Sequence, residues 1–190
     1  MVGQYGRAVF EYVPRRVSGE TGRFVELVWF ARGRITGVRE RIAPTGSTVA
    51  AVVLGDPIRQ TPVGEGAALL AEEGFLIGPH DRPIVNEPQG ETFCVGIVTT
   101  PVGCRPTLGL APATLRGRVM DLLRAWPKAL GLRRELMTCR TPAEASMSSR
   151  LPLRRRNRST VTRSSGARPR FSSFRRNLPG RLLISRPGSA

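Results

Sequence analysis

The sequence predicts a mainly β fold, either a barrel or a sandwich, which is followed by a small α-helical segment and a disordered basic carboxy-terminal tail. Three observations lead to this prediction. Short apolar stretches between Tyr12 and Thr100 are separated by Gly, Pro and Asp at intervals of about 8 to 12 residues, which is typical of sandwiches and barrels. After Leu108 the apolar residues recur at helical spacing. After Glu144 the chain contains no acidic residue, and Arg and Ser dominate.

The expected strands have alternating side chains and lie between turn-forming residues. Glu40 shares one strand face with Val38 and Ile42, and Cys94 and Gly96 alternate with apolar neighbours. Because successive strand residues point to opposite faces, one face of each strand can contact a core. We expect a mobile hairpin tip at residues 60–68, and strands at Phe24–Phe30, Gly37–Ile42, Thr48–Leu54, Gly74–Ile77 and Thr92–Thr99.

The helical segment is expected in two parts. Pro112 stands at a favourable first helical position, and Pro127 ends or kinks the first helix. A second helix is expected to end near Thr138. The two helices either pack on the β-rich part or provide the interface of a homodimer, and the sequence leaves both alternatives open. The apolar face of the first helix consists of Leu115, Val119, Leu122, Leu123 and Trp126.

Charge divides the 190-residue chain, whose net charge is +16, into two compositions. Residues 1–138 contain 17 basic and 13 acidic side chains, whereas residues 139–190 contain 13 basic and 1 acidic. A segment of such charge, interrupted by prolines, repels itself and cannot bury a core. We therefore expect a β-rich sensor-like domain at 1–107, a helical segment at 108–145 that packs on it or dimerises, and a disordered Arg/Ser-rich tail at 146–190.

A helix start without a helix marks the boundary of the tail. Thr141, Pro142 and Glu144 have the arrangement of a capping box, with Thr as N-cap and Glu at the third helical position. The following residues, Ala145 to Pro152, include poor helix formers and no apolar face. Because the capping box predicts a helix and the residues after it do not, we hypothesise a reading-frame shift near codon 145.

The sequence gives no support for catalysis, metal binding or a membrane span. It contains no Gly-x-Ser-x-Gly nucleophile elbow and no phosphate-binding loop, and its single histidine, His80, lies in a turn. Its three cysteines fit neither a disulfide framework nor a zinc site. No apolar run approaches the roughly 20 residues that span a membrane, and the amino terminus does not resemble a signal peptide. We expect a cytoplasmic protein that is not an enzyme and binds neither a metal nor a cofactor.

A series of sequence blocks extends over about residues 8 to 145. The blocks are YVPRR (Tyr12–Arg16), RFVELVWF (Arg23–Phe30), RERIAPTGST (Arg39–Thr48), LGDPIRQ (Leu54–Gln60), GPHDRPI (Gly78–Ile84) and the helical stretch Leu108–Leu136. In this order they resemble the amino-terminal domain of AraC-type bacterial transcription regulators. The resemblance implies a cupin-like β-barrel that serves as a sensor or dimerisation domain, followed by a pair of helix-turn-helix units.

The tail does not match the second half of that expectation. Residues 146–190 contain no pair of amphipathic helices joined by a short turn, so the groove-reading element of the family is missing from the sequence. We expect the ligand-sensing and dimerisation part of an AraC-type regulator, truncated or frame-shifted so that specific DNA binding is lost. The alternative is a stand-alone module that binds a small molecule or a protein and whose basic tail holds nucleic acid.

Two sets of residues are candidates for binding. Resemblance and position indicate that a small-molecule effector contacts Trp29, Arg41, Arg59, His80 and Arg82. Trp29 is alternatively a core aromatic residue, and the arginines alternatively pair with nearby carboxylates. Weak, non-specific nucleic-acid binding is expected through arginines of the tail, since a segment free of acids can neutralise phosphates. The candidates are Arg154, Arg155, Arg156, Arg158, Arg175 and Arg176.

Overall fold

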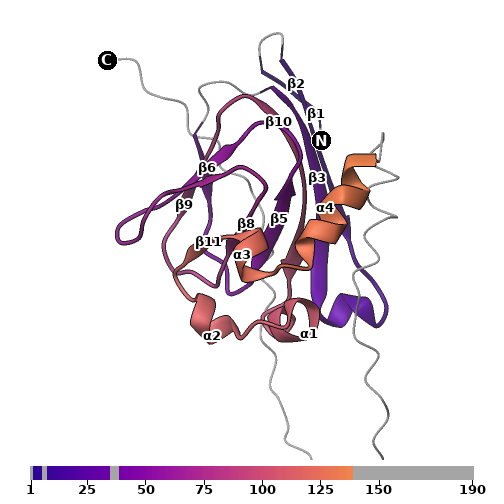
Figure 1. Ribbon diagram of the computed structural model, residues 1–190, viewed down its shortest axis with the longest axis vertical. Helices are drawn as coiled ribbons and strands as arrows, with labels where there is room; N and C mark the ends of the chain where they lie inside the picture. Colours follow the sequence, from indigo (N-terminus) through magenta and orange to yellow (C-terminus); the bar gives the residue numbers. More distant parts are fainter. Residues whose placement is uncertain (1, 6–7, 35–38, 139–190) are drawn as a thin grey trace, which may run out of the picture.

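The computed structural model describes residues 2–5, 8–34 and 39–138 (Figure 1). It confirms a mainly β fold, built from two antiparallel sheets and a few short helices. The expected tail at 146–190, the capping box that begins at Thr141 and the six arginines proposed to bind nucleic acid lie outside the described residues.

The larger sheet has seven strands, and the smaller sheet has four. In spatial order, the larger sheet contains β1 (Val2–Tyr5), β2 (Ala8–Arg16), β3 (Val25–Arg34), β10 (Glu91–Thr99), β5 (Val49–Val53), β8 (Gly74–Ile77) and β11 (Val119–Asp121). The smaller sheet contains β4 (Glu40–Ile42), β9 (Ile84–Pro88), β6 (Ile58–Pro62) and β7 (Leu69–Ala71). A short 3-10 helix, η1 (Thr21–Arg23), precedes β3.

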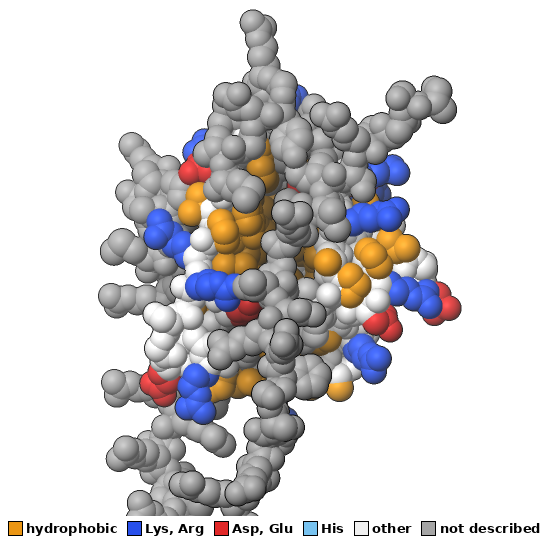
Figure 2. Space-filling model, turned by 180° about the vertical axis from the view of Figure 1, so that it is seen from behind, with side chains coloured by type: hydrophobic (Ala, Val, Ile, Leu, Met, Phe, Trp, Pro, Cys, Tyr) orange, Lys and Arg blue, Asp and Glu red, His pale blue; other side chains and the backbone are white. Residues whose placement is uncertain are grey.

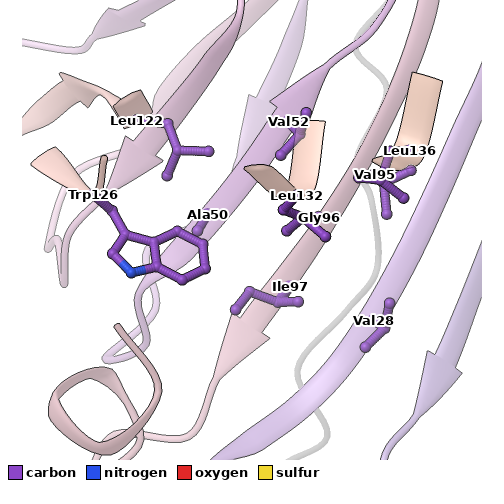
Figure 3. Close-up of a pocket in the computed structure, with 10 residues that line it drawn as sticks. All are labelled: Val28, Ala50, Val52, Val95, Gly96, Ile97, Leu122, Trp126, Leu132 and Leu136. Atoms are coloured by element: carbon purple, nitrogen blue, oxygen red, sulfur yellow. The ribbon is translucent and has the colours of Figure 1, made fainter. Parts of the chain in front are cut away.

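Four short helices accompany the larger sheet. In Figure 1, α1 (Cys104–Leu108) and α2 (Pro112–Leu115) lie at its lower end, whereas α3 (Leu122–Ala125) and α4 (Ala129–Thr138) cover the face that lies away from the smaller sheet. In Figure 1, α3 and α4 lie in front of the larger sheet, where α3 contacts β5 and β8 and α4 contacts β5. Figure 3 shows Leu122, Trp126, Leu132 and Leu136 directed toward the apolar side chains of this sheet.

The contact between helices and sheet is closely packed. The space that remains there is about 20 Å³, which is room for about one water molecule. Its lining is apolar, so a polar ligand would find no hydrogen-bond partner in it. Helices α3 and α4 therefore pack on the β-rich body. This is one of the two arrangements that the sequence left open.

Strand β5 is buried on both faces. Val49, Ala51 and Val53 belong to the core between the two sheets, whereas Ala50 and Val52 belong to the core under the helices. All five residues are buried, since both faces of the strand are covered. A strand in this position requires a continuous run of apolar residues. The expected strand at Thr48–Leu54 is thus confirmed as the central strand of a layered body.

The expected continuous helix from Pro112 to Trp126 is wrong. The chain leaves the helical conformation after Leu115, and Gly117 adopts a left-handed φ of 68°. Residues Val119–Asp121 then pair with β8 as the edge strand β11. The edge of β8 presents unpaired backbone N–H and C=O groups that can pair with a further strand. The spacing of apolar residues in the sequence contains no information about this pairing. The Asp121 side chain accepts a hydrogen bond of 2.8 Å from the backbone N–H of Arg124 and so caps α3.

Several strands were not predicted, and others differ in length. No strand was expected where β1, β2, β6, β7 and β9 lie, and β4 covers only Glu40–Ile42 within the described part of Gly37–Ile42. The predicted tip at residues 60–68 is shorter than expected, because Ile58–Pro62 pairs with both Leu69–Ala71 and Ile84–Pro88. Only residues 63–68 remain as the connection of this hairpin.

Replacing Gly96 with Ala is expected to destabilise the protein. Gly96 lies opposite Trp29 in the β3–β10 pairing, and a Cβ atom at Gly96 would lie 2.4 Å from Trp29 Cε2. Overpacking of this kind costs about 1–3 kcal/mol of unfolding free energy, which denaturant titration measures. The matched control is Gly131→Ala in α4, where the new Cβ would have no atom within 4 Å apart from its chain neighbours and the backbone of its own helix. The control is expected to raise stability by about 0.5–1 kcal/mol.

Candidate functional site

A cavity of about 180 Å³ lies between the two sheets. Inward-facing residues of both sheets line it, because alternate residues of each strand point into this space. Its lining is mainly apolar with a few polar groups, which is the usual character of a small-molecule site. The lining residues are Phe10, Tyr12, Trp29, Ala31, Glu40, Ile42, Val49, Ile58, Phe75, Asn86, Pro88, Thr92, Cys94 and Val98.

The larger sheet gives the cavity an aromatic wall. Phe10 and Tyr12 come from β2, Trp29 from β3 and Phe75 from β8. The rings of Tyr12 and Trp29 are tilted by 40° with their centroids 6.0 Å apart, within the range of favourable aromatic contacts. Gly96 has no side chain above this wall, so the Trp29 indole can lie against the β10 backbone.

The smaller sheet presents a row of three polar side chains across adjacent strands. Asn86 of β9 lies opposite Glu40 of β4 on one side and opposite Gln60 of β6 on the other. Gln60 Nε2 donates to Asn86 Oδ1 at 2.5 Å, and Asn86 Nδ2 donates to Glu40 Oε2 at 3.2 Å. Because Gln60 occupies the Asn86 oxygen, the Asn86 amide is oriented with its donor toward the Glu40 carboxyl group.

The cavity disfavours charge on its titratable groups. Burial raises the pKa of the Glu40 carboxyl, and the hydrogen bond from Asn86 opposes this by a smaller amount. Burial also raises the pKa of the Cys94 thiol to about 12, and nearby Glu40 acts in the same direction. The pKa of Tyr12 is raised by burial and by the neighbouring Cys94 and Glu40. No Arg, Lys or His among the described residues lines the cavity.

Two polar atoms near the cavity have no hydrogen-bond partner among the described residues. They are Thr92 Oγ1, from a residue that lines the cavity, and Gln60 Oε1, from the end of the polar row. Buried polar atoms are nearly always paired with protein, water or ligand. The cavity region therefore retains unused capacity for hydrogen bonding.

The five ligand-binding residues predicted from the sequence do not form one site. Trp29 lines the cavity. Arg41 and Arg59 are exposed and alternate with the inward-facing Glu40, Ile58 and Gln60, so they point from the outer face of the smaller sheet. Figure 2 shows the rear face of the molecule, where Lys and Arg side chains border a hydrophobic area.

His80 and Arg82 lie instead at a polar cleft of about 360 Å³. His80 Nδ1 lies 2.9 Å from the Gly78 carbonyl oxygen, to which it donates. The cleft contains acidic residues, Glu65 and Asp81, as well as the basic Arg82 and Arg116. Because charges of both signs line the cleft, it favours neither an anionic nor a cationic ligand. The cavity between the sheets differs, because Glu40 is the single acidic side chain in its lining.

The prediction from sequence missed most of the cavity. One signal was present: Glu40 occupies the apolar face of its strand, which is unusual for a carboxylate. Asn86 and Gln60 could not be found in this way, because the strands that carry them were not predicted.

The described residues contain no group of three or more His, Cys, Asp and Glu side chains arranged to hold a metal ion. Within the same part of the chain, no helix is long and apolar enough to cross a membrane.

The fold and the cavity define a class of protein: a mainly β domain of two antiparallel sheets with a largely apolar cavity between them. The chain belongs to the family of the domain of unknown function DUF6597, whose family model matches residues 20–121. The match extends from η1 to the end of β11 and includes every lining residue of the cavity except Phe10 and Tyr12. No curated protein matches the chain in sequence.

The Cys94 thiol is expected to be unreactive in the folded protein. With a pKa of about 12, about one thiol in ten thousand is ionised at pH 8, and only the thiolate reacts. Labelling a Cys104→Ser, Cys139→Ser double variant with a chromogenic disulfide reagent isolates this cysteine. Labelling in denaturant should be faster by orders of magnitude than in buffer, and equal rates would contradict the assigned burial.

Glu40→Gln is expected to stabilise the protein at neutral pH. Since the pKa of Glu40 is raised on folding, the folded state favours the protonated form. This preference favours folding fully below the unfolded pKa and is lost as the pH rises through the folded pKa. The variant should be more stable than wild type at pH 7, and the difference should shrink toward pH 3. Urea titrations at several pH values measure this, and a constant difference would refute it.

Proposed function

We propose that this chain is the ligand-sensing and dimerisation part of an AraC-type transcription regulator. The observation that carries the proposal is the cavity between the sheets, with its aromatic wall and its polar row. An effector in this space would contact both sheets at once. Its binding energy could then change how the sheets and their covering helices are packed, which is the coupling that a sensor requires.

The size of the cavity supports a small effector. A cavity of about 150 Å³ lined by apolar side chains is large enough to hold benzene, so 180 Å³ suits a molecule with one ring and a short substituent. A homodimer would bring two such sites together. Leu130 and Met137 of α4 are 41% and 60% exposed and provide apolar surface for this contact.

The resemblance to the regulator family supports the same function, although the helix-turn-helix units have no counterpart in the sequence after Glu144. We propose that a reading-frame shift near codon 145 has removed specific DNA binding, because the composition changes there to an Arg- and Ser-rich segment. Cytoplasmic localisation and the absence of catalysis belong to the same proposal.

Filling the cavity is expected to abolish ligand binding. Ala31 lines the cavity and is buried, so Ala31→Leu places three additional carbon atoms in it. Benzene or indole at ten times its Kd should stabilise the wild type by about 1.4 kcal/mol and raise its melting temperature. The same molecule should give no shift with Ala31→Leu. Ala67→Leu at the exposed hairpin connection is the control and should keep the full response.

Equal ligand-induced shifts in both variants would place binding outside the cavity, and no shift in any of the proteins would contradict the sensor proposal.

The second candidate function is a stand-alone binding module with a nucleic-acid-binding tail. It is favoured by the 13 basic residues and 1 acidic residue in 139–190. If six phosphates are contacted, affinity for DNA should fall by about three orders of magnitude between 50 and 200 mM salt. A variant that ends at Thr138 should not bind DNA.

Translating the other frames of the encoding DNA beyond codon 130 separates the two candidate functions. Two helix-turn-helix patterns in one of those frames would favour a disrupted regulator.

A further inference from the structure

Glu40 is the single acidic side chain among the cavity lining. It enters from β4 and faces the wall formed by Phe10, Tyr12, Trp29 and Phe75. The described residues provide no cation to neutralise it from within the cavity. An unpaired carboxylate in an apolar space is costly, so the protein either protonates it or meets a positive charge that arrives with the ligand.

The polar row supports the ionised form of Glu40. Asn86 Nδ2 donates a hydrogen bond to Glu40 Oε2, and a donor stabilises a carboxylate more than a neutral acid. The Asn86 amide cannot reverse without losing the hydrogen bond from Gln60 Nε2 to its oxygen. The row thus holds a donor against Glu40, although that donor alone does not balance the charge.

The aromatic wall has the complementary property. The faces of Trp and Tyr rings carry negative potential and attract ammonium groups within about 6 Å, most strongly where water is excluded. An anionic ligand would be repelled by Glu40, and these ring faces would not attract it. A neutral apolar ligand would use the wall but would leave the Glu40 carboxylate with the Asn86 hydrogen bond alone and no positive charge beside it.

We propose that the cavity binds a compact organic cation, an amine with a small apolar body, whose ammonium group pairs with Glu40 against the aromatic wall. The inference rests on the proposed function, since it names the class of effector for the same cavity. The volume of 180 Å³ limits the body to about one ring with a short substituent.

Three probes of nearly equal size test the proposal on the full chain: benzylamine, benzyl alcohol and benzoate. Calorimetry at pH 7.5 should give at least about tenfold tighter binding of benzylamine than of benzyl alcohol, because a hydrogen bond to a charged group exceeds a neutral one by this amount or more. Benzoate should bind most weakly.

Glu40→Gln separates the charge from the shape of the site. In this variant benzylamine should lose about tenfold or more in affinity, whereas benzyl alcohol should change by less than about twofold. The matched control is Glu87→Gln, which removes a carboxylate from β9 that points outward and pairs with Arg39 at 3.4 Å. The control should leave the affinities of all three probes unchanged.

The pH dependence provides a test that needs no variant. Glu40 faces two other titratable groups, Tyr12 from β2 and Cys94 from β10, and the raised pKa values of both keep them neutral in acid. Benzylamine binding should therefore weaken as Glu40 is protonated at falling pH, whereas benzyl alcohol binding should stay constant.

Equal affinities for benzylamine and benzyl alcohol, unchanged by Glu40→Gln, would overturn the cation assignment and leave the sensor proposal intact. Preference for benzoate would also overturn it. If none of the three probes binds, both the cation assignment and the sensor proposal fail.

Discussion

The rest of the structure depends on the burial of β5 and β10 on both of their faces. The helices cover one face of this strand pair, and the smaller sheet covers the other. Strands buried on both sides must carry apolar or small residues throughout, which accounts for the run Val49–Val53 and for Gly96 beside Trp29. The cavity of about 180 Å³ lies between this second layer and the larger sheet.

The polar row is placed where it opposes stability. Gln60, Asn86 and Glu40 face inward from three adjacent strands, where apolar residues would contribute more to the core. Burial raises the pKa of Glu40, so the folded protein is less stable when this group is ionised. Departures of this kind from good packing are concentrated at binding sites, and this one coincides with the largely apolar cavity.

The DUF6597 match places most of the site in the region that defines the family. Residues 20–121 include the polar row, Trp29 and Phe75, so the charged and apolar parts of the cavity both lie in the matched region. Phe10 and Tyr12 of β2 complete the aromatic wall from outside it. Helix α4 also lies beyond the match, and its buried Leu136 belongs to the core between the helices and the larger sheet.

The sequence by itself determined the mainly β class, the central strand at Val49–Val53 and the position of Glu40 on an apolar strand face, because side-chain alternation and turn residues are local signals. The tertiary structure decided which faces meet. Residues Val119–Asp121 pair with β8, although their apolar spacing predicts a helix. Asn86 lies beside Glu40, which is 46 residues away in the sequence. Strand pairing and cavity formation depend on contacts between distant segments, and no local pattern encodes those contacts.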